Sequence, residues 1–252
     1  MLSFEHGTPI AKVADGRYKN SIIGIESEDK GKKRGFIGSE FINDGKLIPL
    51  MNIDDRAVEY IAGPSGSGKS TMAVILINNY FKVYPKKDFY IFSRTNWEDD
   101  PAFNKLIKKP LQVPVDESLL NFAMDITTEM SESVVLFDDI TTIQDQKVKK
   151  KVESIICDVL EVGRKMDINI VFTNHLVIPN ERQFARTIMN ELKMLTVFPK
   201  SGSAQQISYV LKTYFGLDKH QIAKILSLPS RWVRISRSYP NYVMCEFGVY
   251  IL

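Results

Sequence analysis

The apolar residues between positions 58 and 198 are grouped in short runs. These runs lie at residues 58–62, 89–92, 134–137, 168–173 and 194–198, and they show no apolar/polar alternation. Runs of this kind are typical of strands buried on both faces, which requires helices on each side of a largely parallel sheet. We therefore predict an α/β fold with a mainly parallel, five-stranded sheet.

The segments between these runs are expected to be helical. One helix should begin in a glycine-rich loop after residue 62 and stop before Pro85. A second is expected from about Asp116, a residue type that favours the N-cap position, through residue 130. A third should cover roughly residues 147–165.

The C-terminal part has a different pattern. Ser203 and Asp218 are each followed three residues later by glutamine, as in a capping box, which predicts two short helices around Gly216. Such a pair resembles a helix-turn-helix, although two capped helices beside a core have the same pattern. Residues 232–251 are expected to form a β-hairpin that turns near Pro240 and the asparagine after it.

Three parts are therefore expected along the chain. Residues 1–50 are rich in glycine and charge and contain β-like pieces at 21–25 and 46–51, which predicts an antiparallel lead-in. Residues 51–200 form the α/β core. Residues 201–252 add the helix pair and the hairpin, packed on the core.

Composition excludes several classes of protein. The chain has 252 residues, 44% of them hydrophobic and 25% charged, as in an average globular protein. A net charge of +3 means that any nucleic-acid contact must come from a local patch. Cys157 and Cys245 form no CxxC or Cys/His cluster, so neither zinc nor a disulfide framework is indicated. With no signal peptide and no membrane span of about 18 apolar residues, a soluble, non-secreted protein is expected.

The strongest chemical signal is a match to GxxxxGK[ST], placed between a predicted strand and a predicted helix. Glycine lets the backbone approach a phosphate closely, and the N-terminus of the next helix favours the anion. Lys69 should reach the β- and γ-phosphates of ATP, and the Ser70 hydroxyl should bind Mg²⁺. The residues of this P-loop are Gly63, Pro64, Ser65, Gly66, Ser67, Gly68, Lys69, Ser70 and Thr71.

A second signal is the apolar run at 134–137, which ends in Asp138 and Asp139. A carboxylate at the end of a strand beside a P-loop is how such enzymes hold magnesium. Asp138 is therefore the candidate on the metal side, and Asp139 is placed to polarise the attacking water. An ordinary strand leaving the core would have the same pattern.

Two further groups of residues are weaker candidates. The run at 168–173 ends in Asn174 and His175, either of which is placed to sense the γ-phosphate, although a turn residue and an exposed histidine would look alike. Arg182 and Arg186 lie four residues apart, on one face if helical. An arginine supplied to a neighbouring subunit would stabilise the transferring phosphoryl group, but most surface arginines have no such role.

Basic residues are also grouped at several places, where either a phosphate backbone or solvent alone would satisfy them. The groups are Lys30, Lys32, Lys33 and Arg34; Lys147, Lys149, Lys150 and Lys151; and Arg231, Arg234 and Arg237.

Two missing motifs narrow the class of P-loop protein. No LSGGQ-like segment precedes the acidic pair, which argues against an ABC transporter subunit, and no NKxD argues against a GTPase. The segments GPSGSGKST, VVLFDD, the helix ending in Gly163-Arg164-Lys165, and INIVFTNH together resemble the FtsK/HerA superfamily over residues 58–198. Within it, the chain is most similar to the genome-packaging ATPases of poxviruses, giant viruses and virophages.

This resemblance implies a RecA-like additional-strand core that assembles into a homo-oligomeric ring, usually a hexamer or pentamer. It also implies ATP-driven movement of double-stranded DNA into a capsid, with capsid or portal-vertex proteins as partners, in the host cytoplasm, the virus factory or the virion. Two positions depart from the family: Asp139 stands where glutamate is usual, and Asn174-His175 where many members have glutamine. A nucleotide-dependent assembly switch that moves no DNA, and a helicase or recombination ATPase, are the alternatives.

Overall fold

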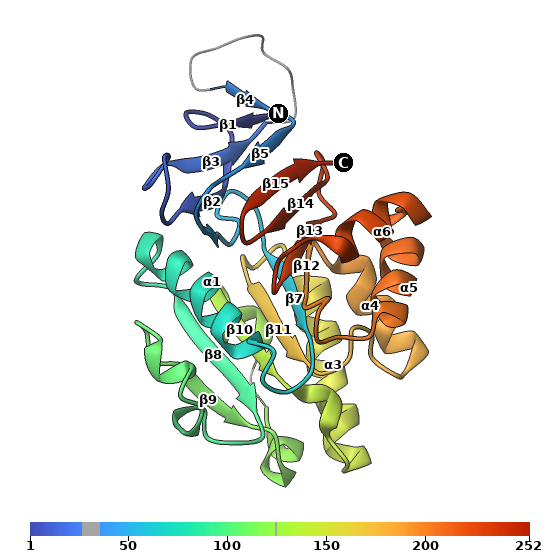
Figure 1. The fold of residues 1–252 in the computed structure, drawn as a ribbon. Coiled ribbons are helices and arrows are strands. Elements are labelled where there is room, and N and C mark those ends of the chain that lie inside the picture. Colours follow the sequence, from blue (N-terminus) through green and yellow to red (C-terminus); the bar gives the residue numbers. More distant parts are fainter. Residues whose placement is uncertain (27–35, 124) are drawn as a thin grey trace. The chain divides into compact units, whose positions relative to one another are not determined.

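The computed structural model describes residues 1–26, 36–123 and 125–252 (Figure 1). Contacts between residues divide the chain into two compact units. The first unit combines Met1–Asp55 with Lys193–Leu252, and the second unit is Arg56–Leu192. Segments from the two ends of the sequence thus fold together, whereas the P-loop and the acidic pair belong to the second unit.

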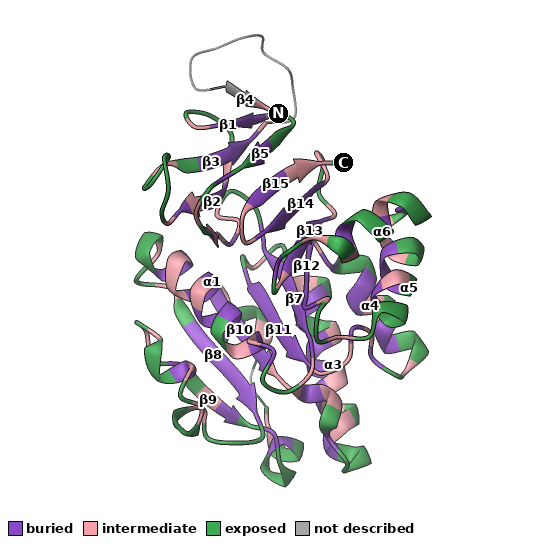
Figure 2. Ribbon diagram, viewed as in Figure 1, coloured by how far each residue is buried: buried purple, intermediate pink, exposed green. Residues whose placement is uncertain are grey.

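A parallel sheet with the strand order β7-β11-β10-β8-β9 forms the centre of the second unit. Its strands are β7 (Val58–Ala62), β8 (Asp88–Ser93), β9 (Leu111–Pro114), β10 (Ser133–Asp138) and β11 (Asn169–Asn174). The residues of β7, β10 and β11 are buried almost throughout (Figure 2), as the uninterrupted apolar runs predict. The predicted α/β class with a mainly parallel five-stranded sheet is confirmed.

One predicted strand lies elsewhere. The run at 194–198 forms β12 (Met194–Val197), which belongs to the first unit and pairs antiparallel with β13 (Val233–Ser236). The fifth parallel strand is instead β9, whose pattern gave no signal because only Val113 is buried in it. Its closing proline is tolerated because β9 is an edge strand.

Helices cover both faces of the parallel sheet. They are α1 (Lys69–Val83), α2 (Ile126–Glu129), α3 (Gln146–Val162), α4 (Arg182–Glu191) and the 3₁₀ turns η1 (Trp97–Asp99), η2 (Phe103–Lys105), η3 (Glu117–Asn121) and η4 (Ile140–Thr142). The chain moves from β7 through α1 to β8 in one direction across the sheet, and from β10 through α3 to β11 in the other. Because such crossovers are right-handed, α1 and α3 lie on opposite faces (Figure 1).

The long helix expected from Asp116 is wrong. Asp116 does act as an N-cap, since its side chain accepts a hydrogen bond of 2.8 Å from Ser118 N, but the helix that follows is only the 3₁₀ turn η3. Asp125 then caps α2 through a bond of 2.9 Å from Thr127 N. A second cap inside the segment competes with continuation of one helix, because Asp side chains bond nearby backbone N–H groups.

The C-terminal end of α3 is held by a buried arginine of the same unit. The guanidinium of Arg56 donates to the carbonyl oxygens of Ile168 (3.0 Å), Leu160 (2.9 Å) and Val159 (2.8 Å). The last carbonyls of a helix lack partners within the helix and carry its negative dipole end. Arg56 satisfies two of them and ties α3 to the start of β11.

Two antiparallel sheets make up most of the first unit. One has the order β4-β1-β3-β2-β6, and the other runs β5-β15-β14-β13-β12 within this unit. Their remaining strands are β1 (Leu2–Ser3), β2 (Thr8–Val13), β3 (Ile22–Ile25), β4 (Phe36–Gly38), β5 (Glu40–Ile42), β6 (Leu47–Pro49), β14 (Tyr242–Cys245) and β15 (Gly248–Ile251). Buried residues from both sheets, including Ile23, Phe41 and Met244, share one core. The antiparallel lead-in is confirmed.

Both expected C-terminal helices are present as α5 (Ala204–Phe215) and α6 (Lys219–Ser227). Asp218 forms a complete capping box, and Gly216 ends α5 in the left-handed conformation. The expected hairpin is part of a larger structure, since β13 and β14 pair around Pro240 and β15 adds a third antiparallel strand. No helix among the described residues is long and apolar enough to span a bilayer.

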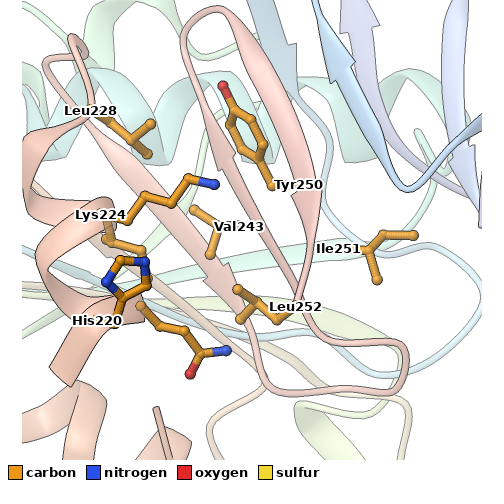
Figure 3. Close-up of a pocket in the computed structure, with 9 residues that line it drawn as sticks. His220, Lys224, Leu228, Val243, Tyr250, Ile251 and Leu252 are labelled. Carbon is orange, nitrogen blue, oxygen red and sulfur yellow. The ribbon is translucent and has the colours of Figure 1, made fainter. Parts of the chain in front are cut away.

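A pocket of about 270 Å³ lies between α6 and the β14–β15 hairpin (Figure 3). Aliphatic side chains such as Leu228 and Val243 line most of it, and the amine of Lys224 points inward. None of the candidate site residues lines this pocket.

Candidate nucleotide-binding site

The P-loop follows β7 directly and leads into α1. Gly66 (φ 74°) and Gly68 (φ 109°) have positive φ angles that side chains with a Cβ rarely adopt. Gly68 occupies the N-cap of α1, where no side chain accepts from the first backbone N–H groups. The Ser67 hydroxyl is buried and has no hydrogen-bond partner among the described residues. This loop therefore presents donors to an anion at the positive end of a helix.

Lys69 begins α1 and its side chain turns back across the loop. It is only 7% exposed, and its Nζ lies 3.4 Å from the carbonyl oxygen of Pro64. The same Nζ lies 3.4 Å from Nδ1 of His175. The predicted lysine and one predicted sensor residue are thus in contact.

Asp138 closes β10 at the carboxyl edge of the sheet. Thr173 Oγ1 donates a hydrogen bond to its Oδ1, and Ser93 Oγ donates to its Oδ2 at 3.3 Å. Burial raises the pKa of Asp138 to about 6, and the neighbouring charge of Asp139 adds to the rise, whereas the two hydroxyl donors oppose it. A nearby cation would favour the ionised form of this carboxyl.

Asp139 adopts a left-handed backbone conformation, with φ 47°. The N–H of Asp139 donates to the carbonyl oxygen of Thr173 (2.8 Å), and the carbonyl oxygen of Asp139 accepts from Thr142 Oγ1 (2.9 Å). Its Oδ2 lies 3.1 Å from Nε2 of His175. A strained non-glycine residue held by three contacts is typical of functional sites.

His175 therefore bridges Lys69 and Asp139. Nδ1 of His175 faces a donor, the Lys69 ammonium, and Nε2 faces an acceptor, the Asp139 carboxylate. The two contacts together fix the orientation of the ring.

Asn174, by contrast, lies beneath the site. It is fully buried, and its carbonyl oxygen accepts a hydrogen bond of 3.1 Å from the first P-loop residue, Gly63. The nearby hydroxyl of Tyr60 donates to Leu176 O at 3.0 Å, and the Asn174 amide has no partner of good geometry among the described residues. Asn174 thus joins β11 to the loop through its backbone.

The arginine candidates lie apart from this cluster. Arg182 and Arg186 are exposed on α4, and they share a face, as their spacing predicts. Among the described residues, neither forms a hydrogen bond or ion pair with the P-loop or the acidic pair.

The predicted groups of basic residues differ in whether they are described and in how exposed they are. Lys30, Lys32, Lys33 and Arg34 lie outside the described residues. In β13, Arg234 is only 1% exposed, so neither a phosphate backbone nor bulk solvent reaches it as expected for its group. Burial of its neighbours on both sides explains the difference, because the whole strand is interior.

Three site residues were not predicted: Ser93, Thr142 and Thr173. Ser93 and Thr173 close or nearly close apolar runs at the same sheet edge as Asp138, which is a signal that could have identified them. Thr142 ends the short 3₁₀ turn η4, for which the sequence offers no pattern.

These residues fit a magnesium–nucleotide complex. Among the described residues, no group of three or more His, Cys, Asp or Glu side chains is placed to hold a metal ion. Mg²⁺ typically binds one or two protein oxygens together with substrate phosphates. Asp138, the last residue of β10, and Ser70, the second residue of α1, carry oxygens of the kind that this pattern requires.

Comparison with known proteins identifies the family. Protein V3 of the Sputnik virophage, an uncharacterised protein, is 39% identical over 253 residues and covers 98% of both chains. The chain belongs to the V3 family. No family model matches it.

Two solved structures with low sequence identity to this chain share its fold. The DNA-packaging ATPase B204 of Sulfolobus turreted icosahedral virus is 13% identical with a TM-score of 0.53, over 77% of this chain and 98% of that one. The conjugation coupling protein TcpA of pCW3 is also 13% identical, with a TM-score of 0.53 over 96% and 77% of the two chains. The chain therefore shares the fold of these two proteins, which agrees with the fold that the sequence resemblance implies.

Proposed function

We propose that this V3-family protein is an ATP-hydrolysing DNA translocase that packages a double-stranded viral genome. The observation that carries the proposal is the chain of contacts from Lys69 through His175 to Asp139. It joins a phosphate-binding loop to a carboxylate at the carboxyl edge of a parallel sheet, where ligands bind in such folds. The fold shared with a DNA-packaging ATPase supports genomic DNA as the molecule that this protein moves.

The P-loop residues bind the phosphates of ATP. Backbone N–H groups from Gly66 to Ser70 and the Lys69 ammonium surround the β- and γ-phosphates. Asp138 and the Ser70 hydroxyl hold the metal side of the site. Bound Mg²⁺ supplies charge neutralisation for the leaving and transferring phosphates.

Asp139 orients and polarises the attacking water. Its left-handed backbone directs the carboxylate out of the strand, and His175 holds one of its oxygens. Aspartate is one methylene shorter than the glutamate usual in the superfamily, so the histidine contact has the role of fixing the shorter side chain. His175, with Asn174 beneath it, senses the γ-phosphate through Lys69.

A ring of subunits, hexameric or pentameric, completes the site. Arg182 or Arg186, exposed on α4, reaches the nucleotide of a neighbouring copy and stabilises the transition-state charge. The capsid or a portal-vertex protein receives the ring, in the host cytoplasm, the virus factory or the virion.

Steady-state ATP hydrolysis, measured with and without long double-stranded DNA over a range of protein concentrations, tests the proposal. We expect DNA to stimulate turnover, and the stimulation to grow with concentration, because the arginine comes from another subunit. K69A provides the blank. K86A, at an exposed lysine that precedes β8 at the opposite edge of the sheet, is the matched control and should hydrolyse ATP like the wild type.

Other outcomes would point elsewhere. ATPase activity indifferent to DNA and to concentration would indicate a nucleotide-dependent assembly switch. Unwinding of a forked duplex would indicate a helicase or recombination ATPase. No hydrolysis above the K69A blank in any condition would contradict the proposed enzyme.

A further inference from the structure

The first turns of α3 carry four lysines, and the structure separates one from the others. Lys149 forms an ion pair with Glu181 at the N-cap of α4. Lys147 and Lys150 are exposed and Lys151 is half-buried, and no side chain of these three forms a hydrogen bond or ion pair with a described residue. We call Lys147, Lys150 and Lys151 the α3 lysine face.

This face is unfavourable for the helix that carries it. The N-terminus of a helix is its positive dipole end, where cations are disfavoured. The N-cap Asp145 places one carboxylate there, accepting from Lys147 N and Val148 N, but the first turn itself contains no acidic residue. Lys147 also lies three and four residues from Lys150 and Lys151, so like charges are neighbours on the helix surface. The half-buried carboxylate of Glu153 follows in the next turn but forms no ion pair with the three lysines. Local rules broken without a structural gain are typical of functional surfaces.

The α3 lysine face is connected to the nucleotide site. α3 begins shortly after β10 ends, so its first turns lie at the carboxyl edge of the sheet. The connection from Asp139 passes through Thr142, whose hydroxyl donates to Asp139 O at 2.9 Å. The Lys149–Glu181 ion pair joins the same turns to the segment that follows His175. A ligand bound to this face would therefore lie close to Asp139 and His175, the two residues proposed to act at the γ-phosphate.

We infer that the α3 lysine face binds the phosphate backbone of double-stranded DNA, an inference that rests on the proposed function. Lysines three and four apart place their Cβ atoms about 5–6 Å from each other, a row of point charges suited to a polyanion. A protein partner fits less well, because interface cores are depleted in lysine and enriched in aromatic residues. Backbone binding of this kind is independent of base sequence, as a packaging motor requires.

The test is the salt dependence of binding to a labelled 30-base-pair duplex of mixed sequence, measured by fluorescence anisotropy with the full chain. The variant is K147Q/K150Q/K151Q. The matched control is K86Q/K109Q/K165Q, which removes the same charge from exposed lysines that precede β8, β9 and β11 at the opposite edge of the sheet. Each phosphate contact contributes about 0.9 to the slope of log K against log salt.

We expect the α3 variant to reduce that slope by roughly 2–3 and to weaken binding at least ~10-fold near 0.1 M salt, and the control to change the slope by less than about 1. The Tm of the α3 variant should equal or exceed that of the wild type, because the substitutions relieve repulsion between lysines at the start of α3.

Equal losses of DNA affinity in both variants, or no loss in the α3 variant, would overturn the inference while leaving the translocase proposal intact. If the α3 variant kept DNA binding but lost self-association in sedimentation, the face would be a contact between copies. A wild-type protein that binds no duplex would contradict the translocase as well.

Discussion

Nε2 of His175 lies 3.1 Å from Oδ2 of Asp139, so the residue that follows β11 contacts the carboxylate of the residue that follows β10. The other ring nitrogen, Nδ1, lies 3.4 Å from the Lys69 ammonium. Neither distance follows from the sequence, in which Asp139 and His175 are separated by a helix and a strand. Together they make His175 the part of the site most open to test.

Substituting Asp139 should affect catalysis rather than binding. D139N keeps the size of the side chain but cannot accept a proton, so kcat should fall by roughly 10²–10⁴ with little change in KM. D139E keeps a carboxylate that can accept the proton and should retain activity. An unchanged kcat in D139N would exclude Asp139 as the group that activates water.

H175A tests orientation of that carboxylate. Loss of the contact leaves the Asp139 carboxylate free to rotate, so kcat should fall on the order of 10²-fold. H175Q can still donate to Asp139 and should recover part of the loss. If H175A changed only the affinity for ATP, as measured by titration calorimetry, His175 would act through Lys69 and not through Asp139.

The raised pKa of Asp138 predicts a pH-dependent stability in the absence of metal. Its pKa is about 6 in the folded protein, above the ordinary 3.8, so the folded state binds more protons between these values. Stability from this group is therefore present at low pH and lost as pH rises toward 6. From pH 4.5 to 7 its ionisation should cost about 2 kcal/mol of unfolding free energy.

Urea unfolding of the wild type and D138N in EDTA at both pH values measures this effect. The asparagine cannot ionise, so the variant should gain about 2 kcal/mol relative to the wild type between pH 4.5 and 7. The difference between the two proteins cancels other carboxylates. A constant difference at both pH values would contradict the raised pKa.

Gly66→Ala separates backbone conformation from steric contact in the P-loop. No atom lies within 4 Å of the position that a Cβ would take at Gly66, so there is room for a methyl group, but its φ of 74° disfavours one. We expect a stability loss of about 1–2 kcal/mol and weaker ATP binding, since the loop must leave the conformation that presents its N–H groups. Thermal unfolding and titration calorimetry measure the two effects, and Gly216→Ala, at a similar φ of 68° outside the P-loop, is the control for ATP binding.

Arg56→Met should destabilise the second unit. Three carbonyl oxygens lose their charged donor, which should cost roughly 3 kcal/mol of unfolding free energy in urea. Arg94, which is exposed and donates to Thr142 O at 3.2 Å, offers a matched arginine control whose replacement by methionine should cost less than about 1 kcal/mol. Equal losses would contradict the role assigned to Arg56.

The sequence predicted what depends on local pattern. The limits of β7 and the start and end of α1 followed from an uninterrupted apolar run, a glycine-rich loop and Pro85. The caps at Asp218 and Gly216 followed from side chains that bond to their own backbone neighbours. Asp116 shows the limit of this reasoning, because its cap was predicted correctly but the length of its helix was not.

By itself, therefore, the sequence determined the P-loop, the acidic pair and the α/β class, since each is encoded by consecutive residues or by a short-range pattern of apolar residues. Tertiary structure alone decided that β9 and not β12 completes the parallel sheet, that Lys149 is paired while its neighbours are exposed, and that His175 stands between Lys69 and Asp139. Each of these outcomes depends on which distant segments become neighbours. That choice is made by the packing of the whole core, and no local spacing encodes it.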